Sequence, residues 1–405
     1  MRRRESWPER LQNTVATCLF FVAISSASAG AGEPAPALEV ETWEGRVLAA
    51  GNLALEGTAL AVGPEKVPLA DVMEIRVLPN TNASDGTQGE LVGLLDGSVH
   101  AGTLAPGLAP GTLHLELAHG GNLEVAKTDL AFLRFHDLEP GVTAADVPPG
   151  PCAILRNGKV LPCEFDFITF LDVGVKAAGA ALQFKREELA RLELSTPAGL
   201  PQEGVVVNSV RGARVIGKLL SLKKGDVAVQ NTRAETFEIG LQNVRGAISF
   251  RCSEIRALEF LSKKRRSLLE LKPAAVVETP LFDFIRKTRF DASLFGDTLQ
   301  ASEHYFQRGI GVHSKSEIRY KLGKEYRRFV SWVGFDTRLT RVGKAVFRVR
   351  GDGKLLAEQP LAASDGLKRL RADVAGVDEL TLELDFGDDD SAGDHGVWGD
   401  PLLIR

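Results

Sequence analysis

The 405-residue sequence lacks the motifs of the common catalytic sites. It contains no HExxH zinc motif, no GxSxG nucleophile elbow, no Walker loop and no dinucleotide-binding fingerprint. Beyond the N-terminal segment, no run approaches the ~18 apolar residues that a transmembrane helix needs. Aromatic residues make up only 7% of the chain, and the strands predicted in its middle carry no aromatic stripe. These absences predict a non-enzymatic protein without stable membrane insertion.

The N-terminus has the three-part layout of a secretory signal peptide. Basic residues, including Arg2 and Arg10, precede the apolar run Val15–Ile24 and the small residues Ala27–Ala29. Residues 1–29 are therefore predicted to be removed, and the mature chain to be secreted or periplasmic. Removal takes away four arginines and two glutamates, so the net charge changes from −4 to about −6. An acidic surface of this kind predicts no nucleic-acid partner.

The chain has only four cysteines, and two of them flank a turn sequence. Asn157-Gly158 is the dipeptide that best suits a two-residue type I′ hairpin. Counting outward from such a turn places Cys152 opposite Cys163. A cross-strand disulfide is one interpretation in an oxidising compartment. Two reduced, buried thiols are the alternative.

The middle of the chain repeats one sequence pattern. Short segments of alternating apolar and polar residues, separated by glycine turns, are followed by a closing segment with a polar or acidic start and alternating apolar residues. Such a pattern, without a sustained apolar period of 3.6 residues, predicts all-β units. We expect a linker at 30–40, small SH3-like or barrel-like β modules at 41–140, 150–200 and 204–262, and a basic linker at 263–279. The modules are also candidates for binding a protein partner. The closing segments are LADVMEIRVL (69–78), KTDLAFLRF (127–135), KREELARLEL (185–194) and CSEIRALEFL (252–261).

The last stretch, residues 280–405, alternates apolar and polar residues in several strands. Leu380, Leu382 and Leu384 alternate with Thr381 and Glu383. A nearly continuous apolar run at 329–335 suits a central strand that is buried on both faces. Antiparallel strands with one face in the core predict a β-sandwich.

Four motifs punctuate these strands in a fixed order. They are GIGVHS (309–314), WVGFD (332–336), RGDGK (350–354) and DHGVWGDP (394–401). Their order and spacing closely resemble the NPCBM family of carbohydrate-binding modules. The resemblance covers roughly residues 282–405 and implies a galactose-binding-like jelly-roll β-sandwich with a carbohydrate or cell-surface glycan as partner. No hydrolase domain accompanies the module, which departs from the pattern of enzyme-linked members.

Five residues at motif positions are candidates for contacting a sugar. Trp398 would stack on the apolar face of the ring, and His313, Asp336, Asp394 and His395 would bind hydroxyls. Each has a structural alternative. Trp398 suits the core equally well, Asp336 could cap a turn, and His313 could bond to a loop backbone.

The loop that leads to the last motif is rich in acidic residues. Asp388, Asp390 and Asp394 bring together the oxygen ligands that a structural calcium ion requires, although their spacing is not that of an EF-hand. A hydrated acidic loop without metal is the alternative. No other cofactor is predicted.

The sequence therefore predicts a secreted, non-catalytic carbohydrate-binding protein made of tandem small β modules and a jelly-roll module. Two other functions remain open. One is an extracytoplasmic structural or protein-interaction role, and the other is a secreted glycoside hydrolase with an unrecognised site.

Overall fold

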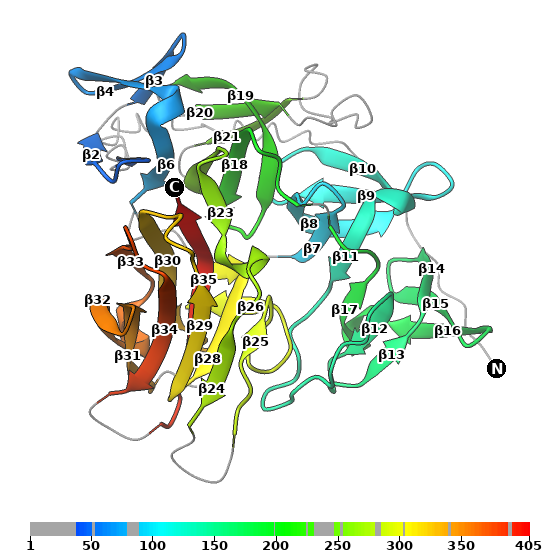
Figure 1. The fold of residues 1–405 in the computed structure, drawn as a ribbon. Helices are drawn as coiled ribbons and strands as arrows, with labels where there is room; N and C mark the ends of the chain where they lie inside the picture. The colour runs from blue at the N-terminus through cyan, green and yellow to red at the C-terminus, as the bar shows by residue number, and fades with distance from the viewer. Residues whose placement is uncertain are drawn as a thin grey trace, which may run out of the picture. The chain divides into compact units, whose positions relative to one another are not determined.

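The computed structural model describes residues 38–50, 53–78, 89–197, 199–223, 226–230, 247–251, 254–279, 285–302, 304–338, 342–387 and 391–405 (Figure 1). These residues form β-strands and short 3-10 turns, without any α-helix in the described part. The predicted all-β class is therefore confirmed. No helix in the described ranges is both long enough and apolar enough to span a bilayer. The predicted signal peptide lies outside the described residues.

Residues 38–261 form four consecutive β units. In each unit the last strand pairs antiparallel with the first. Unit 1 comprises β1 (Leu38–Thr42), β2 (Val47–Ala50), β3 (Leu53–Glu56), β4 (Ala59–Val62), β5 (Glu65–Pro68), η1 (Leu69–Asp71) and β6 (Val72–Val77). Unit 2 comprises β7 (Glu90–Leu94), β8 (Val99–Pro106), β9 (Thr112–Leu117), β10 (Asn122–Ala126), η2 (Lys127–Asp129) and β11 (Leu130–Arg134). Because β1 begins at Leu38, the linker predicted at 30–40 ends before that residue.

Units 3 and 4 follow the same order. Unit 3 comprises β12 (Cys152–Leu155), β13 (Val160–Pro162), β14 (Glu164–Ile168), β15 (Asp172–Ala177), β16 (Ala180–Lys185), η3 (Arg186–Glu188) and β17 (Leu189–Glu193). Unit 4 comprises β18 (Gly204–Ser209), β19 (Arg214–Lys223), β20 (Asp226–Gln230), β21 (Ala247–Arg251) and β22 (Ile255–Leu261). The repeated closing segments of units 1 to 3 are each a 3-10 turn followed by the last strand. In unit 3 the Lys185 backbone N–H donates to the Glu188 carboxylate at 2.7 Å, which stabilises the turn of that unit.

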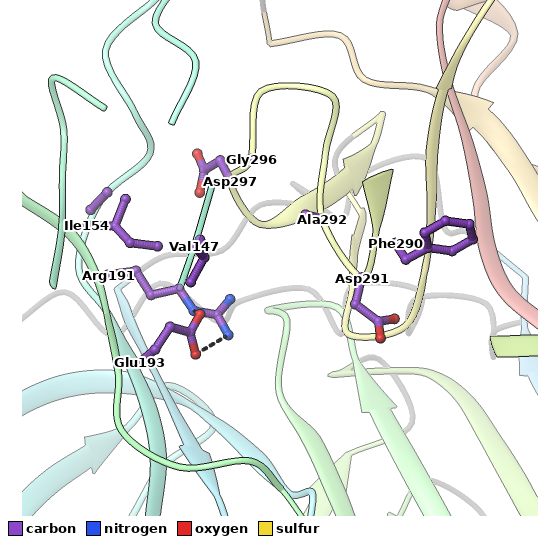
Figure 2. Close-up of a pocket in the computed structure, with 10 residues that line it drawn as sticks. Val147, Ile154, Arg191, Glu193, Phe290, Asp291, Ala292, Gly296 and Asp297 are labelled. Atoms are coloured by element: carbon purple, nitrogen blue, oxygen red, sulfur yellow. Dashed lines mark hydrogen bonds and ion pairs between the residues drawn. The ribbon is translucent and has the colours of Figure 1, made fainter. Parts of the chain in front are cut away.

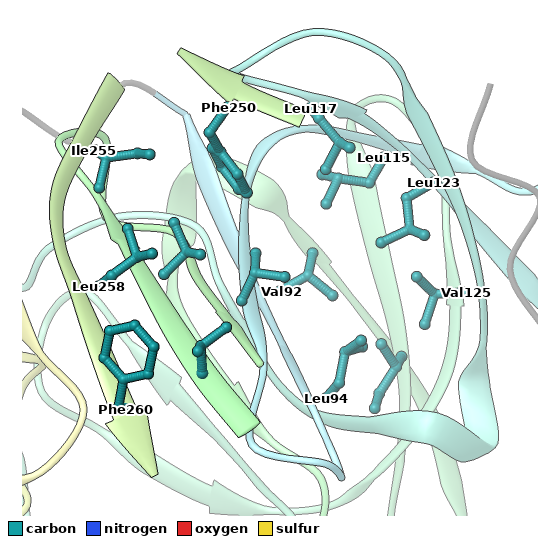
Figure 3. Close-up of a cluster of buried hydrophobic side chains, with 14 of the residues drawn as sticks. Val92, Leu94, Leu115, Leu117, Leu123, Val125, Phe250, Ile255, Leu258 and Phe260 are labelled. Atoms are coloured by element: carbon teal, nitrogen blue, oxygen red, sulfur yellow. The ribbon is translucent and has the colours of Figure 1, made fainter. Parts of the chain in front are cut away.

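The four units are joined through their strands and through one apolar core. A continuous sheet runs in the order β13-β12-β17-β11-β7-β8-β19-β18-β22-β6-β1-β2. Figure 3 shows side chains of units 2 and 4, such as Val92 and Leu258, in a single cluster. Units of this size bury little apolar surface alone, so the shared core stabilises all four together.

The turn between β12 and β13 differs from the predicted one. The Leu155 N–H donates to the Lys159 carbonyl at 2.9 Å, and the Gly158 N–H donates to the Leu155 carbonyl at 2.9 Å. Gly158 has φ of +82°, so the loop has three residues and ends in a glycine bulge rather than a type I′ turn. The longer loop shifts the register by one residue.

The shifted register makes the predicted disulfide wrong. Cys152 pairs with Pro162 instead of Cys163. Successive side chains of a strand point to opposite faces, so the two sulfurs lie on different sides of the sheet. Cys152 packs in a cluster with Leu138, whereas Cys163 belongs to the core shared by the four units. Both thiols are free and buried.

Residues 265–404 form a two-layered antiparallel sandwich. One sheet has the order β25-β28-β35-β30-β33, with β23 added beside β35, and the other has the order β24-β29-β34-β31-β32. The first contains β23 (Arg265–Ser267), β25 (Arg289–Phe290), β28 (Gly309–His313), β30 (Arg328–Phe335), β33 (Lys368–Asp373) and β35 (His395–Ile404). The second contains β24 (Ala275–Glu278), β29 (Ser316–Lys321), β31 (Lys344–Gly351), β32 (Lys354–Ala362) and β34 (Glu379–Phe386). A hairpin of β26 (Leu299–Ala301) and β27 (His304–Phe306) and the turns η6 (Leu268–Glu270) and η7 (Ala363–Asp365) complete the sandwich.

The basic segment predicted as a linker contributes two strands to this sandwich. β23 pairs with β35, and β24 pairs with β29. Arg265 makes a 3.0 Å ion pair with Glu259 of unit 4. The prediction of a solvated linker at 263–279 is therefore wrong for these strands, because backbone pairing and an acidic partner hold the basic residues in place.

A buried carboxylate links unit 1 to the sandwich. Glu41 of β1 accepts hydrogen bonds from Arg328 at 2.7 Å and from Arg371 at 2.6 Å, and both arginines belong to the sandwich. The side chain of Glu41 is fully buried. Burial alone would raise its pKa, but Arg371, with Arg369 and Arg328, lowers it to about 2. A charge buried and paired in this way fixes the sandwich against unit 1.

Candidate functional site

Four of the five predicted sugar-contacting residues come together at one end of the sandwich. β28 and β30 flank β35, and His313 of β28 pairs directly with His395 of β35. The Asp336 N–H, just beyond β30, donates to the His395 carbonyl at 2.8 Å. Asp394 immediately precedes β35. The ends of three adjacent strands therefore explain why motifs far apart in sequence converge.

Trp398, the fifth residue, lies in the core. Its side chain is 0% exposed and packs against Phe347, with ring centroids 5.2 Å apart, and Phe329, at 6.3 Å. β35 is a central strand with neighbours on both edges and the second sheet over one face. The predicted role of Trp398 in stacking on a sugar is therefore wrong, and its structural alternative is the observed one.

Asp336 is also unavailable to a ligand. It is only 3% exposed, and both of its carboxylate oxygens accept hydrogen bonds from Arg338, at 2.9 and 2.6 Å. Arg338 also donates to Asp297 at 3.0 Å and to Asp137, between units 2 and 3, at 3.1 Å. The bidentate pair and the two further carboxylates make this a structural junction. The predicted hydroxyl contact of Asp336 is wrong because the carboxylate is fully committed.

Asp394 is a buried acceptor for the loops around it. Ser314 Oγ donates to one carboxylate oxygen at 2.5 Å, and the Lys344 N–H donates to the other at 2.9 Å. These bonds leave the carboxylate poorly placed for a sugar hydroxyl or a metal ion. Asp388 and Asp390, the other predicted calcium ligands, lie outside the described residues. Within the described ranges, no group of three metal-binding side chains occurs.

The two histidines form the remaining polar cluster at this end. Their ring centroids lie 5.7 Å apart, and the Phe295 ring stands edge-on to His395 at 5.1 Å. The His313 Nδ1 lies 2.9 Å from the Ser314 carbonyl. Burial, with the charges of Arg286 and His313, lowers the pKa of His395 to about 4, so its ring is neutral at neutral pH. Among the described residues, the buried His395 Nδ1 has no hydrogen-bond partner.

An exposed aromatic side chain lies on the edge strand of the same sheet. Phe290 of β25 is 40% exposed, and it is the only aromatic residue among the large exposed apolar side chains of the described sandwich. The next residue, Asp291, accepts hydrogen bonds from Arg308 Nε at 3.0 Å and from the Gly309 N–H at 3.1 Å. Sequence reasoning missed Phe290. Its one signal was an aromatic residue in a polar stretch, Thr288 to Ser293, without an alternating strand pattern.

A pocket of about 190 Å³ lies beside this segment, and Phe290 and Asp291 belong to its lining. Figure 2 shows Ile154, Arg191 and Glu193 of unit 3 on one side of it and Phe290, Asp291 and Ala292 of the sandwich on the other, with Gly296 and Asp297 between them. The ring of Phe290 is turned away from the labelled unit 3 residues, although Phe290 belongs to the lining. The lining residues are Val147, Ile154, Ala190, Arg191, Glu193, Phe290, Asp291, Ala292, Gly296 and Asp297.

Comparison with known proteins agrees with the motifs. Residues 277–404 match the NPCBM/NEW2 domain, so the predicted family is confirmed for the C-terminal third of the chain. A Renibacterium salmoninarum protein named "Putative endo-alpha-N-acetylgalactosaminidase" is 35% identical over 66 residues, which are 16% of this chain and 4% of that protein. The chain thus matches a small fraction of that relative's length.

Two solved structures from Clostridium perfringens are also similar. CBM51-2 with the INT domains of ZmpB, in complex with GlcNAc, is 24% identical, with a TM-score of 0.33, over 45% of this chain and 39% of that one. CBM51 from GH95, in complex with methyl-galactose, is 27% identical, with a TM-score of 0.32, over 35% of this chain and 99% of that one.

Proposed function

We propose that this chain is a secreted, non-catalytic carbohydrate-binding protein whose sandwich binds a glycan at the edge formed by β25 and β28. The NPCBM/NEW2 match supports the class of ligand. The exposed Phe290, which directly precedes Asp291 of the Asp291–Arg308 pair in sequence, is the observation that carries the choice of site. The short match to a protein named "Putative endo-alpha-N-acetylgalactosaminidase" also supports a glycan as the class of ligand.

The chemistry at this edge suits a sugar ring. An aromatic face covers the apolar C–H side of a pyranose, and a carboxylate and a guanidinium bind its hydroxyls as acceptor and donor. The side chains of Asp291 and Arg308 are 43% and 37% exposed. Because the pair is already half-solvated, exchanging water for a hydroxyl costs little desolvation. Phe290 thus takes the role that the sequence assigned to Trp398.

A glycan array probed with the full-length chain and with Phe290→Ala tests the proposal. We expect the wild-type chain to bind a defined set of glycans, and Phe290→Ala to lose about tenfold or more in affinity, since stacking on an aromatic is the main apolar contact. Leu355→Ala is the matched control, because Leu355 is 49% exposed on the distant edge strand β32. Its binding should equal that of the wild type.

Three possible results distinguish an error in the proposed site from an error in the proposed function. Absence of any bound glycan in the wild type would overturn the proposal. Binding retained in Phe290→Ala but lost in His313→Ala would keep the function and move the site to the histidine cluster. Release of reducing sugars from a bound glycan by purified protein would replace the binding function with the hydrolase alternative.

Exposed apolar side chains in two loops of the β units favour a second candidate function, which is binding of a protein partner. Leu108, between β8 and β9, is 88% exposed, and Phe170 and Leu171, between β14 and β15, are 73% and 69% exposed. Arg186 donates to the carbonyls of Leu104 at 2.9 Å and Phe170 at 3.3 Å, so it holds the second loop beside β8. If the two loops bind a protein, the triple serine variant of Leu108, Phe170 and Leu171 should keep glycan binding and lose that partner in a cross-linking experiment.

A further inference from the structure

The pocket between unit 3 and the sandwich is built from two parts of the chain that are distant in sequence. Ile154 of β12 and Arg191 and Glu193 of β17 lie on one side, and Ala292 lies on the other (Figure 2). Neither the family match nor the motifs include the wall from unit 3. The pocket therefore exists only where the third β unit meets the sandwich.

One half of the lining is apolar. Ile154 and Ala190 are buried beside the pocket, within a cluster that also contains Cys152 and Phe295. Val147 is 42% exposed at the pocket. Such side chains suit the C–H surface of a small ligand.

The other half carries a fixed pair of opposite charges. Arg191 Nε lies 2.5 Å from Glu193 Oε1, and these side chains are 21% and 30% exposed. The Arg191 guanidinium also lies over the Phe132 ring, 4.0 Å from its centroid, which restricts its position. A held guanidinium and a held carboxylate together offer hydrogen-bond donors and acceptors at one place.

We propose that this pocket is a second binding site, which takes a single neutral sugar unit with adjacent hydroxyls. Its volume of about 190 Å³ is below the about 300–1,000 Å³ of pockets for drug-sized molecules, so it suits one ring rather than a chain. The carboxylate accepts from one hydroxyl and the guanidinium donates to the next. An acidic sugar is excluded because its carboxylate would meet Glu193 and Asp297.

The pocket shares Phe290 and Asp291 with the edge site proposed above, whereas Arg191, Glu193 and Ala292 belong to the pocket alone. The Phe290 ring points away from Arg191 and Glu193, so variants at those two residues change the pocket without changing that ring. The two proposals consequently fail separately. The third β unit gains a role as half of a ligand site.

A titration monitored by saturation-transfer NMR tests this site. The full-length chain is titrated with methyl hexosides and, separately, with hexuronic acids. We expect hexosides to bind the wild type and hexuronates not to bind. Ala292→Phe should reduce hexoside affinity by more than about tenfold, because the added ring occupies the pocket. Ala362→Phe, a half-exposed position on β32, is the matched control and should bind as the wild type does.

Glu193→Gln gives a test of charge that preserves shape. It should weaken hexoside binding by about fivefold and allow hexuronate binding, because Arg191 then lacks its partner. This variant decides the question even if Ala292→Phe fails to fold. Hexoside binding that is absent in the wild type, or unchanged in both pocket variants, overturns the proposal.

Discussion

In one sheet of the sandwich, an aromatic residue on the central strand is buried and an aromatic residue on the edge strand is exposed. Trp398, on central strand β35, belongs to the most conspicuous motif of the sequence and is fully buried. Phe290, on edge strand β25, belongs to no motif and is 40% exposed. Gly399, within the same motif, lies so close to Phe306 that an added Cβ would be 2.5 Å from that ring. The residues of this motif therefore pack tightly in a central strand. The exposed ring of Phe290 lies on the edge strand instead.

Truncating each aromatic residue tests this contrast with the largest expected effect. Trp398→Ala should reduce the free energy of unfolding by about 3–5 kcal/mol, because it leaves a cavity between the two sheets. Phe290→Ala should change it by less than about 0.5 kcal/mol, as at an ordinary surface position. Urea denaturation followed by circular dichroism measures both. Similar losses in the two variants would contradict the assignment of core and edge.

The sequence predicted the strands well because alternation is a local property. The buried Leu380, Leu382 and Leu384 and the central strand at 329–335 lie where their patterns placed them. His313 and His395, which the family motifs made candidates for one site, lie at paired positions of β28 and β35. Local patterns suffice wherever burial follows from the alternation of a single strand.

The failures concern contacts that no local pattern encodes. Asp336 is committed to Arg338, which also binds Asp137, 201 residues away in sequence. The register of Cys152 changed by one residue because a three-residue loop replaced a two-residue one. Phe290 is exposed only because β25 lies at the edge of its sheet, which depends on the order of all the strands.

Lowering the pH should have the next largest effect on the free energy of unfolding, because buried and exposed carboxylates also differ. The folded pKa of Glu41, about 2, is below the ordinary value of 4.5. Its ionised form therefore stabilises the fold above about pH 4.5, and this contribution is lost as the pH falls toward 2. A shift of this size corresponds to about 3 kcal/mol. Unfolding free energies measured between pH 6 and pH 2 should show the loss.

Two variants identify the residue responsible. Glu41→Gln should already be destabilised at pH 6, since it leaves Arg328 and Arg371 without their carboxylate, and it should lose less stability in acid. Glu325→Gln removes an exposed carboxylate that pairs with Arg405 and should behave as the wild type does. An unchanged acid profile in Glu41→Gln would assign the effect elsewhere.

Arg308→Ala should have a smaller effect, and on binding rather than folding. The Asp291–Arg308 pair is half-exposed, so its loss should change the unfolding free energy by less than about 1 kcal/mol. Glycan affinity should fall about threefold to tenfold, because one hydroxyl loses its donor. Calorimetric titration against the best array ligand measures this. A large loss of stability without a loss of affinity would place Arg308 with the structural pairs instead of the ligand site.

A reducing agent should not change the thermal stability of the protein. This measurement tests the structure of the β12–β13 hairpin, which contributes to one wall of the pocket. Cys152 and Cys163 lie on opposite faces of their sheet and are free, so no disulfide constrains β12 and β13. Thermal unfolding should be the same with and without dithiothreitol. Alkylation in denaturant without reductant, followed by peptide mass spectrometry, should label both residues. A linked Cys152–Cys163 peptide would restore the two-residue turn and, with it, a different pocket wall.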